Sequence, residues 1–170
     1  MSSEVGQVFS INCSPGGVPK LPVAEALFAE FGVFGDDQRN KKYHGGPDRA
    51  VCLFSLERIR ALQEEGHPIS TGSTGENLTV SGIDWDLVTP ECVLEVGDAV
   101  LEITAYTTPC KTIRDSFIDR NFMRISHRLH PGWSRVYARV LKEGLVRTGD
   151  RVSLSPAGMA RKGWLESLLS

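Results

Sequence analysis

The stretch CVLEVGDAVLEITAY, residues 92 to 106, decides the fold class of this 170-residue chain. Its two halves, CVLEV (92 to 96) and AVLEITAY (99 to 106), show the period-two alternation and β-branched enrichment of half-buried strands. The Gly-Asp pair between them favours a tight turn. This part of the sequence therefore predicts two consecutive strands separated by a turn.

The same strand pattern continues on the carboxy-terminal side, in SRVYARVLK (134 to 142) and DRVSLS (150 to 155). The segments EVGDAVLEI (95 to 103) and RTGDRVSLS (147 to 155) share a Gly-Asp pair followed by alternating apolar residues. Two copies of so short a pattern indicate matched strand entries in a closed sheet rather than a repeat array. The prediction is a mainly β fold, a closed β-barrel with a few short α-helices.

Two segments carry helix signals. LPVAEALFAEFG (21 to 32) has a proline near its start, a glycine at its end and apolar residues at helical spacing, so we predict a helix there. SLERIRALQEEG (55 to 66) carries a stronger signal, because Ser55 can cap the helix and Gly66 can end it. The polar segment KTIRDSFIDRNFMRISHRLH (111 to 130) is compatible with helix, with Ile113, Phe117, Phe122 and Ile125 as apolar anchors.

Composition excludes several classes of function. The chain has 19 Lys and Arg against 21 Asp and Glu, a net charge of -2, so no overall field favours nucleic acid or an anionic membrane. The sequence has neither a signal-peptide pattern at its start nor a run of about 18 apolar residues, which predicts a cytoplasmic protein without a membrane span. Its 4 cysteines form no CxxC pair, which argues against a structural zinc site, and the reducing compartment expected for the protein argues against disulfides.

Cys110 differs from the other cysteines in its surroundings. In TTPCKTIRD (107 to 115) it follows a proline and precedes Lys111 and Arg114, cationic neighbours that favour the thiolate form. Cys52 and Cys92 lie in apolar strand-like runs and are expected to be inert buried thiols, whereas Cys13, in NCSPGG, is expected to be exposed. A thiolate can ligate a sulfur-loving metal or carry sulfur. The residues alone leave open whether Cys110 does either or is a small apolar side chain.

Two glycine-containing loops carry further polar residues. KKYHGGPDRAV (41 to 51) allows His44 and Arg49 to project from a tight turn, although a solvated surface turn explains the pattern as well. STGSTGENLTVSGIDW (70 to 85) offers free backbone N–H groups, hydroxyls, Glu76 and Asn77 for a polar ligand, with a flexible connector as the alternative. Its Trp85 is expected to cover the core.

Taken in order, the segments HGGPDRAV, GENLTVSG and PCKTI, followed by GWSRVYARVLKEGLVRTGDRV, resemble the MOSC domain, the family named after the carboxy-terminal part of molybdenum cofactor sulfurase. GVPKLPV and FGDDQRN also look like its amino-terminal pattern, so the resemblance covers about residues 5 to 155. It implies a closed, mostly β barrel, here a single domain over residues 1–155 followed by a short tail over 156–170. The tail is expected to pack on the barrel or to form a dimer contact.

The resemblance also implies a role for each candidate residue. Cys110 matches the cysteine that ligates molybdenum held by a pterin dithiolene, or that delivers sulfur to that cofactor. By position, His44, Arg49, Glu76 and Asn77 would line or brace the pocket. Arg135 is an added candidate for the cofactor's phosphate, because a guanidinium suits a bidentate contact with an oxyanion.

Two hypotheses for the function follow from the resemblance. The first is a molybdenum-dependent reductase of N-hydroxylated compounds, a small-molecule substrate class, with electrons from a separate redox partner protein and His44 as a proton donor. The second is a non-catalytic sulfur carrier or handover module with a persulfide on Cys110, working with a cofactor-maturation protein. A third reading is a scaffold that does neither. Pyridoxal phosphate is not expected, because the lysine context of that site is absent from the sequence.

Overall fold

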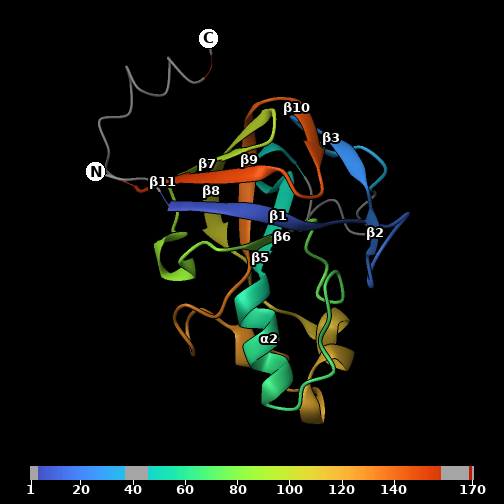
Figure 1. The fold of residues 1–170 in the computed structure, drawn as a ribbon. Coiled ribbons are helices and arrows are strands. Elements are labelled where there is room, and N and C mark those ends of the chain that lie inside the picture. The colour runs from blue at the N-terminus through green and yellow to red at the C-terminus, as the bar shows by residue number, and fades with distance from the viewer. Residues whose placement is uncertain (1–3, 37–45, 158–168, 170) are drawn as a thin grey trace.

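The computed structural model describes residues 4–36, 46–157 and 169, and it contains a closed β-barrel of seven strands (Figure 1). The strands follow one another around the barrel in the order β11, β7, β8, β9, β5, β6, β1, and antiparallel pairing of β1 with β11 closes it. Their bounds are β1 Glu4–Cys13, β5 Val51–Ser55, β6 Leu78–Ser81, β7 Val93–Val96, β8 Ala99–Tyr106, β9 Val136–Lys142 and β11 Arg151–Ser155. The predicted fold class is confirmed.

The two strands of the 92 to 106 stretch form as predicted. β7 and β8 are antiparallel neighbours, with Val93 opposite Glu102 and Val96 opposite Ala99. Leu94 and Leu101 lie opposite each other and are fully buried at 0% exposure, whereas Glu95 and Glu102 are only partly buried. The matched Gly-Asp segments lie side by side, because β7 pairs with β11 and the N–H of Gly97 donates to the carbonyl of Arg151.

The helix predicted over residues 21 to 32 is wrong. The segment instead contains β2 (Leu21–Val23), which pairs with β1, followed by β3 (Glu25–Ala29) and β4 (Gly32–Val33). β3 and β4 form a second, three-stranded sheet with β10 (Gly144–Arg147), and this pairing buries Ala26 and Phe28. The segment also fits a period of two, and the partner strand, more than 100 residues away, selects that period.

The second helix prediction is confirmed by α2 (Leu56–Glu64). The hydroxyl of Ser55 caps the helix by accepting a hydrogen bond from the N–H of Arg58, and Leu56, Ile59 and Leu62 form its buried face. Figure 1 shows α2 at one end of the barrel, beside the 3-10 helices that follow β8. Those 3-10 helices are η3 (Lys111–Ser116), η4 (Ile118–Arg120) and η5 (Phe122–Ile125), and shorter ones precede β5 (η1, Pro47–Arg49) and β7 (η2, Trp85–Leu87).

The apolar anchors expected in the 111 to 130 segment face the core: Ile113, Phe117 and Ile125 are buried, and Phe122 packs partly buried against them. Within the described part of the chain, no helix has the length and apolarity that crossing a membrane requires. Most of the tail, residues 158–168 and 170, lies outside the described residues, so its expected packing is not addressed.

Candidate functional site

Cys110 is the accessible thiol of the protein. It lies at the start of η3, is partly exposed, and its Sγ is 2.9 Å from the hydroxyl of Thr112. The other three cysteines are all buried, as expected for Cys52 and Cys92. The expected exposure of Cys13 is wrong: its side chain is only 8% exposed, and burial is the largest cause of its raised pKa.

The loop that carries Cys110 is fixed to strand β9. Thr107 is 2% exposed, and its N–H donates to the carbonyl of Arg135 at 2.9 Å. The hydroxyl of Ser134 donates to the carbonyl of Thr107 at 3.2 Å. The expected basic neighbour Arg114 instead donates to the backbone carbonyl of Lys111. The position of Cys110 is therefore set through the backbone, by the strand that follows Arg135.

Arg135 is a buried cation with unused hydrogen-bonding capacity. Its side chain is 6% exposed and its Nη1 donates to the carbonyl of Thr74 at 2.6 Å. Its buried Nε has no hydrogen-bond partner among the described residues. A buried donor without a partner is costly, and an anion bound beside Arg135 would satisfy it.

Glu76 holds the 70 to 85 loop against Arg135. Its carboxylate is fully buried and accepts hydrogen bonds from the N–H of Gly72 and from the hydroxyls of Thr74 and Thr79, at 3.1, 2.8 and 3.1 Å. Burial raises the pKa of Glu76, and these hydrogen bonds and the charge of Arg135 oppose that rise. Thr74 contacts both side chains, because its hydroxyl donates to Glu76 and its backbone carbonyl accepts from Arg135. Glu76 therefore positions the carbonyl of Thr74 to which Arg135 donates.

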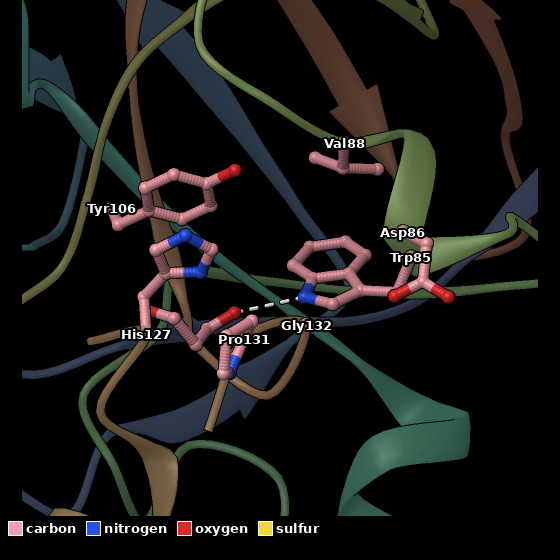
Figure 2. Close-up of a pocket in the computed structure, with 8 residues that line it drawn as sticks. Trp85, Asp86, Val88, Tyr106, His127, Pro131 and Gly132 are labelled. Atoms are coloured by element: carbon pink, nitrogen blue, oxygen red, sulfur yellow. Dashed lines mark hydrogen bonds between the residues drawn. The ribbon is translucent and has the colours of Figure 1, made fainter. Parts of the chain in front are cut away.

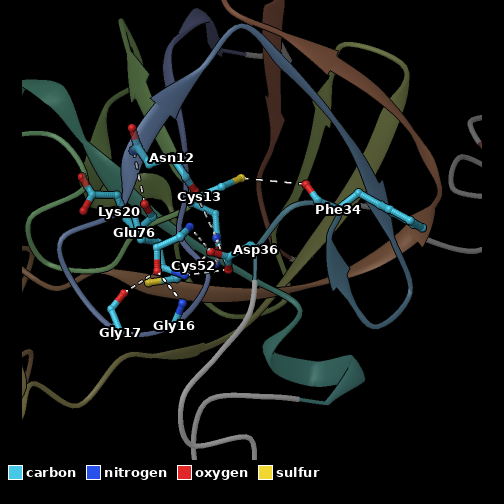
Figure 3. A network of polar contacts seen from close by, with 11 residues as sticks. Asn12, Cys13, Gly16, Gly17, Lys20, Phe34, Asp36, Cys52 and Glu76 are labelled. Carbon is cyan, nitrogen blue, oxygen red and sulfur yellow. Dashed lines mark hydrogen bonds and ion pairs between the residues drawn. The ribbon is translucent and has the colours of Figure 1, made fainter.

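Asn77 belongs to a buried polar network, which Figure 3 shows from close by. Its Oδ1 accepts from the N–H of Cys52 at 3.0 Å, and its Nδ2 donates to Asp36 at 2.8 Å. Lys20 donates to both oxygens of Asp36 at 2.6 Å, and these two side chains are only 6% and 5% exposed. Asn77 is thus a structural brace between β5 and the segment ending at Asp36. Sequence analysis missed the Lys20–Asp36 pair, although both residues lie in segments that resemble the family.

Arg49 and Tyr137 form the outer part of the site. Arg49 is exposed at the end of η1, and its guanidinium carbon lies 5.5 Å from the centre of the Tyr137 ring. Gly46 precedes η1 with a φ of +92°, which supports the tight turn expected from the two glycines. His44 lies outside the described residues, so its predicted place beside Arg49 is not addressed.

Tyr137 interacts electrostatically with the two arginines and with the thiol of Cys110, and sequence analysis missed this residue. Burial raises the pKa of Tyr137 to about 12; nearby Cys52 and Cys110 add to the rise, whereas Arg135 and Arg49 oppose it. The charges of Cys110, Arg49 and Arg135 therefore act on this phenol electrostatically. A tyrosine in the alternating run SRVYARV carries no sequence signal that separates it from an ordinary strand residue.

The site has one accessible thiol but no complete set of metal ligands. In the part of the chain that the structure describes, no group of three or more His, Cys, Asp and Glu side chains could hold a metal ion. A metal at Cys110 would therefore need ligands beyond these described side chains, such as a bound cofactor supplies. Arg49 and Arg135 are suitable donors for a phosphate on such a cofactor.

These features define a class: a small closed β-barrel with an accessible cysteine near two arginines. The family model described as "MOSC domain" matches residues 40–153, and the chain belongs to this family. The family is associated with molybdenum cofactor binding. The expected family membership is confirmed.

Curated relatives extend the comparison. Protein YflK of Bacillus subtilis is 31% identical over 145 residues, which is 84% of this chain and 64% of YflK. Protein YiiM of Escherichia coli is 31% identical over 108 residues, 61% of this chain and 48% of YiiM. The chain therefore spans less than two thirds of either relative.

Solved structures share the fold. YiiM from Geobacillus stearothermophilus matches with a TM-score of 0.69 at 24% identity, covering 91% of this chain and 77% of that one. The YuaD protein from Bacillus subtilis matches with a TM-score of 0.71 at 17% identity, covering 91% and 98%. At these identities the likeness concerns the barrel fold alone.

Proposed function

We propose that this protein binds molybdenum cofactor through Cys110 and reduces N-hydroxylated compounds. The observation that carries the proposal is that Cys110 is the accessible thiol and that its loop is bonded to the backbone of Arg135, a buried cation with an unpaired Nε. The family's association with the cofactor supports this use of the thiol. We also propose a cytoplasmic location, where a reducing environment keeps the thiol available.

The residues of the site fit such a cofactor. Cys110 would supply a thiolate ligand, and Arg135 and Arg49 would bind the phosphate through charge-assisted hydrogen bonds. Glu76 and Asn77 would act indirectly, without contacting the cofactor. Both side chains are fully buried, and they position the loops that carry the other site residues. When bound, the cofactor supplies the two-electron redox chemistry, and the protein supplies placement and electrostatics.

The reduction of an N-hydroxyl group to N–H consumes two electrons and two protons and releases water. Among the chain's own residues, Tyr137 has a pKa raised to about 12, so at neutral pH it adds no negative charge beside the proposed cofactor site. His44 is proposed as the proton donor, since histidine titrates near neutral pH. The electrons would come from a separate redox partner protein.

A sulfur carrier is the second candidate function. The partial exposure of Cys110 favours it too, because a persulfide must be reached by both a donor and an acceptor protein. In that reaction the thiolate of Cys110 attacks the outer sulfur of a donor persulfide, and the donor leaves as a thiolate. A cofactor-maturation protein would then accept the sulfur.

Metal analysis separates the two candidates. We expect wild type and the matched control Cys13→Ser, expressed in a host that makes the cofactor, to retain molybdenum and pterin in equal amounts, and Cys110→Ser to lose both. The loaded protein should reduce an N-hydroxylated purine with an artificial reductant, and His44→Ala should slow this step. A persulfide on Cys110 without molybdenum would favour the sulfur carrier. If the protein carried neither molybdenum nor a persulfide, the scaffold hypothesis would be favoured.

A further inference from the structure

A cavity lies next to the loop that carries Cys110, because Tyr106 and Ser134 line it. It has a volume of about 210 Å³ and is lined by residues of η2, by Tyr106 at the end of β8, and by the 127 to 134 segment (Figure 2). None of the residues proposed to hold a cofactor lines it. The cavity is smaller than the roughly 300–1,000 Å³ of drug-sized pockets, so its size suits one or two fused rings.

Aromatic rings form two sides of this cavity. Tyr106 and His127 are stacked, with ring centres 3.5 Å apart and planes within 6° of parallel. Figure 2 shows Trp85 facing this pair across the gap, and its indole is fixed because Nε1 donates to the carbonyl of Ser134 at 2.8 Å. Aromatic groups that are already positioned favour an aromatic ligand, because little ordering is needed on binding.

His127 supplies a polar group that nothing in the described part of the chain satisfies. Its Nδ1 is buried and makes no hydrogen bond there, and Figure 2 shows a ring nitrogen directed toward the side of the cavity where Trp85 lies. An unpaired buried nitrogen is unfavourable until a ligand group reaches it. A ring nitrogen of a ligand would satisfy it: a pyridine-type nitrogen accepts from Nδ1–H, and a ring N–H donates to an unprotonated Nδ1.

The rim of the cavity does not select a charged ligand. Asp86 is its acidic residue, and the carboxylate is paired with Arg58 at 3.1 Å. Arg58 in turn donates through Nε to the carbonyl of Gly132, so both charges have protein partners. An ionic ligand would therefore compete with an existing ion pair.

We propose that this cavity is a binding site for an uncharged, planar heteroaromatic molecule of one or two fused rings. The ligand lies between Trp85 and the Tyr106–His127 pair, and a ring nitrogen exchanges a hydrogen bond with Nδ1 of His127. The site is independent of the proposed redox function, and its ligand needs neither Cys110 nor a metal.

Three probes of the same shape test this proposal by ligand-observed NMR on the metal-free protein. Benzimidazole carries a donor and an acceptor nitrogen, indole carries only a donor, and indene carries neither. We expect benzimidazole to bind with a Kd of about 1 mM or tighter, as is usual for a ligand of about nine non-hydrogen atoms. Indene should bind about tenfold more weakly, the value of one hydrogen bond.

Two histidine variants identify the recognising group. His127→Phe keeps a stacking ring but removes both nitrogens, so it should weaken benzimidazole binding about tenfold and leave indene binding unchanged. His130→Phe is the matched control, because His130 is exposed and does not line the cavity. Cys110→Ser should bind benzimidazole like wild type, which separates this site from the proposed cofactor site.

No binding of benzimidazole at millimolar concentration would overturn the proposal. Equal binding of indene and benzimidazole would also overturn it, because the cavity would then recognise apolar shape and not a ring nitrogen. An equal loss of binding in His127→Phe and His130→Phe would show that the ligand sits elsewhere.

Discussion

Replacing Asp36 by alanine removes the anionic centre of the buried network beside Asn77. Asp36 accepts four hydrogen bonds: two from the ammonium of Lys20, one from the N–H of Ser14 and one from Asn77. In Asp36→Ala the ammonium of Lys20, whose side chain is 6% exposed, is left without its carboxylate partner. Removing one member of a buried ion pair costs about 3–5 kcal/mol of unfolding free energy.

Urea unfolding followed by circular dichroism measures this loss, with the slope checked for two-state behaviour. The matched control is Asp48→Ala, because Asp48 pairs with Arg139 at 3.2 Å but its side chain is 71% exposed. An exposed pair contributes about 0–1 kcal/mol, so the control should remain close to wild type.

A double variant shows whether the stranded charge causes the loss. Adding Lys20→Met to Asp36→Ala removes the unpaired ammonium, and we expect it to recover more than half of the lost stability. The reasoning would be refuted if Asp36→Ala cost no more than Asp48→Ala, or if Lys20→Met made the Asp36→Ala protein still less stable.

The remaining predictions concern Glu76, Arg135 and Ser55. Burial raises the pKa of Glu76 above its ordinary value of 4.5, so between 4.5 and the raised pKa the folded protein keeps a proton that the unfolded chain has lost. The unfolding free energy of wild type relative to Glu76→Gln should therefore fall as the pH rises above 4.5 toward the raised pKa. Urea unfolding at a series of pH values measures this change. Arg135→Ala should weaken cofactor retention by about tenfold or more, with a larger effect at low salt, whereas the control Arg139→Ala should not. Arg49→Ala should weaken retention as well, and unchanged cofactor content in both Arg135→Ala and Arg49→Ala would contradict the phosphate role. Ser55→Ala should lower the unfolding free energy by about 1 kcal/mol through loss of the α2 cap, while Ser55→Asp, which can still accept from Arg58, should not.

The barrel could be predicted from sequence because its strands carry a strong local pattern. In the 92 to 106 stretch, alternation and a turn pair both specify the same arrangement, and the structure follows it. Residues 21 to 32 fit both helical and strand periods, so the outcome depended on pairing with β10, which no local pattern reveals. Tertiary context decided this segment, as it does wherever local preferences are weak.

The buried contacts of the site were harder to predict than its exposed thiol. Lys20 and Asp36 are both charged and would ordinarily be read as surface residues. Their burial follows from a contact across 16 positions, and Asp36 also binds Asn77, 41 positions away. Cys13 was misplaced for the same reason: the polar sequence around it suggested exposure, whereas the adjoining strands and the 34 to 36 segment cover it.

Tyr137 shows why barrel register determines which residues meet. Side chains two apart on a strand share a face, so within β9 Tyr137 and Arg139 project to the same side. The pairing of β9 with β5 sets Tyr137 opposite Cys52, whose N–H binds Asn77. A shift of one residue in that pairing would turn Tyr137 to the other face and separate it from Arg49. The spacing of motifs identifies residues capable of chemistry, but the pairing of β5 with β9 brings the 46 to 54, 74 to 81 and 107 to 112 segments to one site.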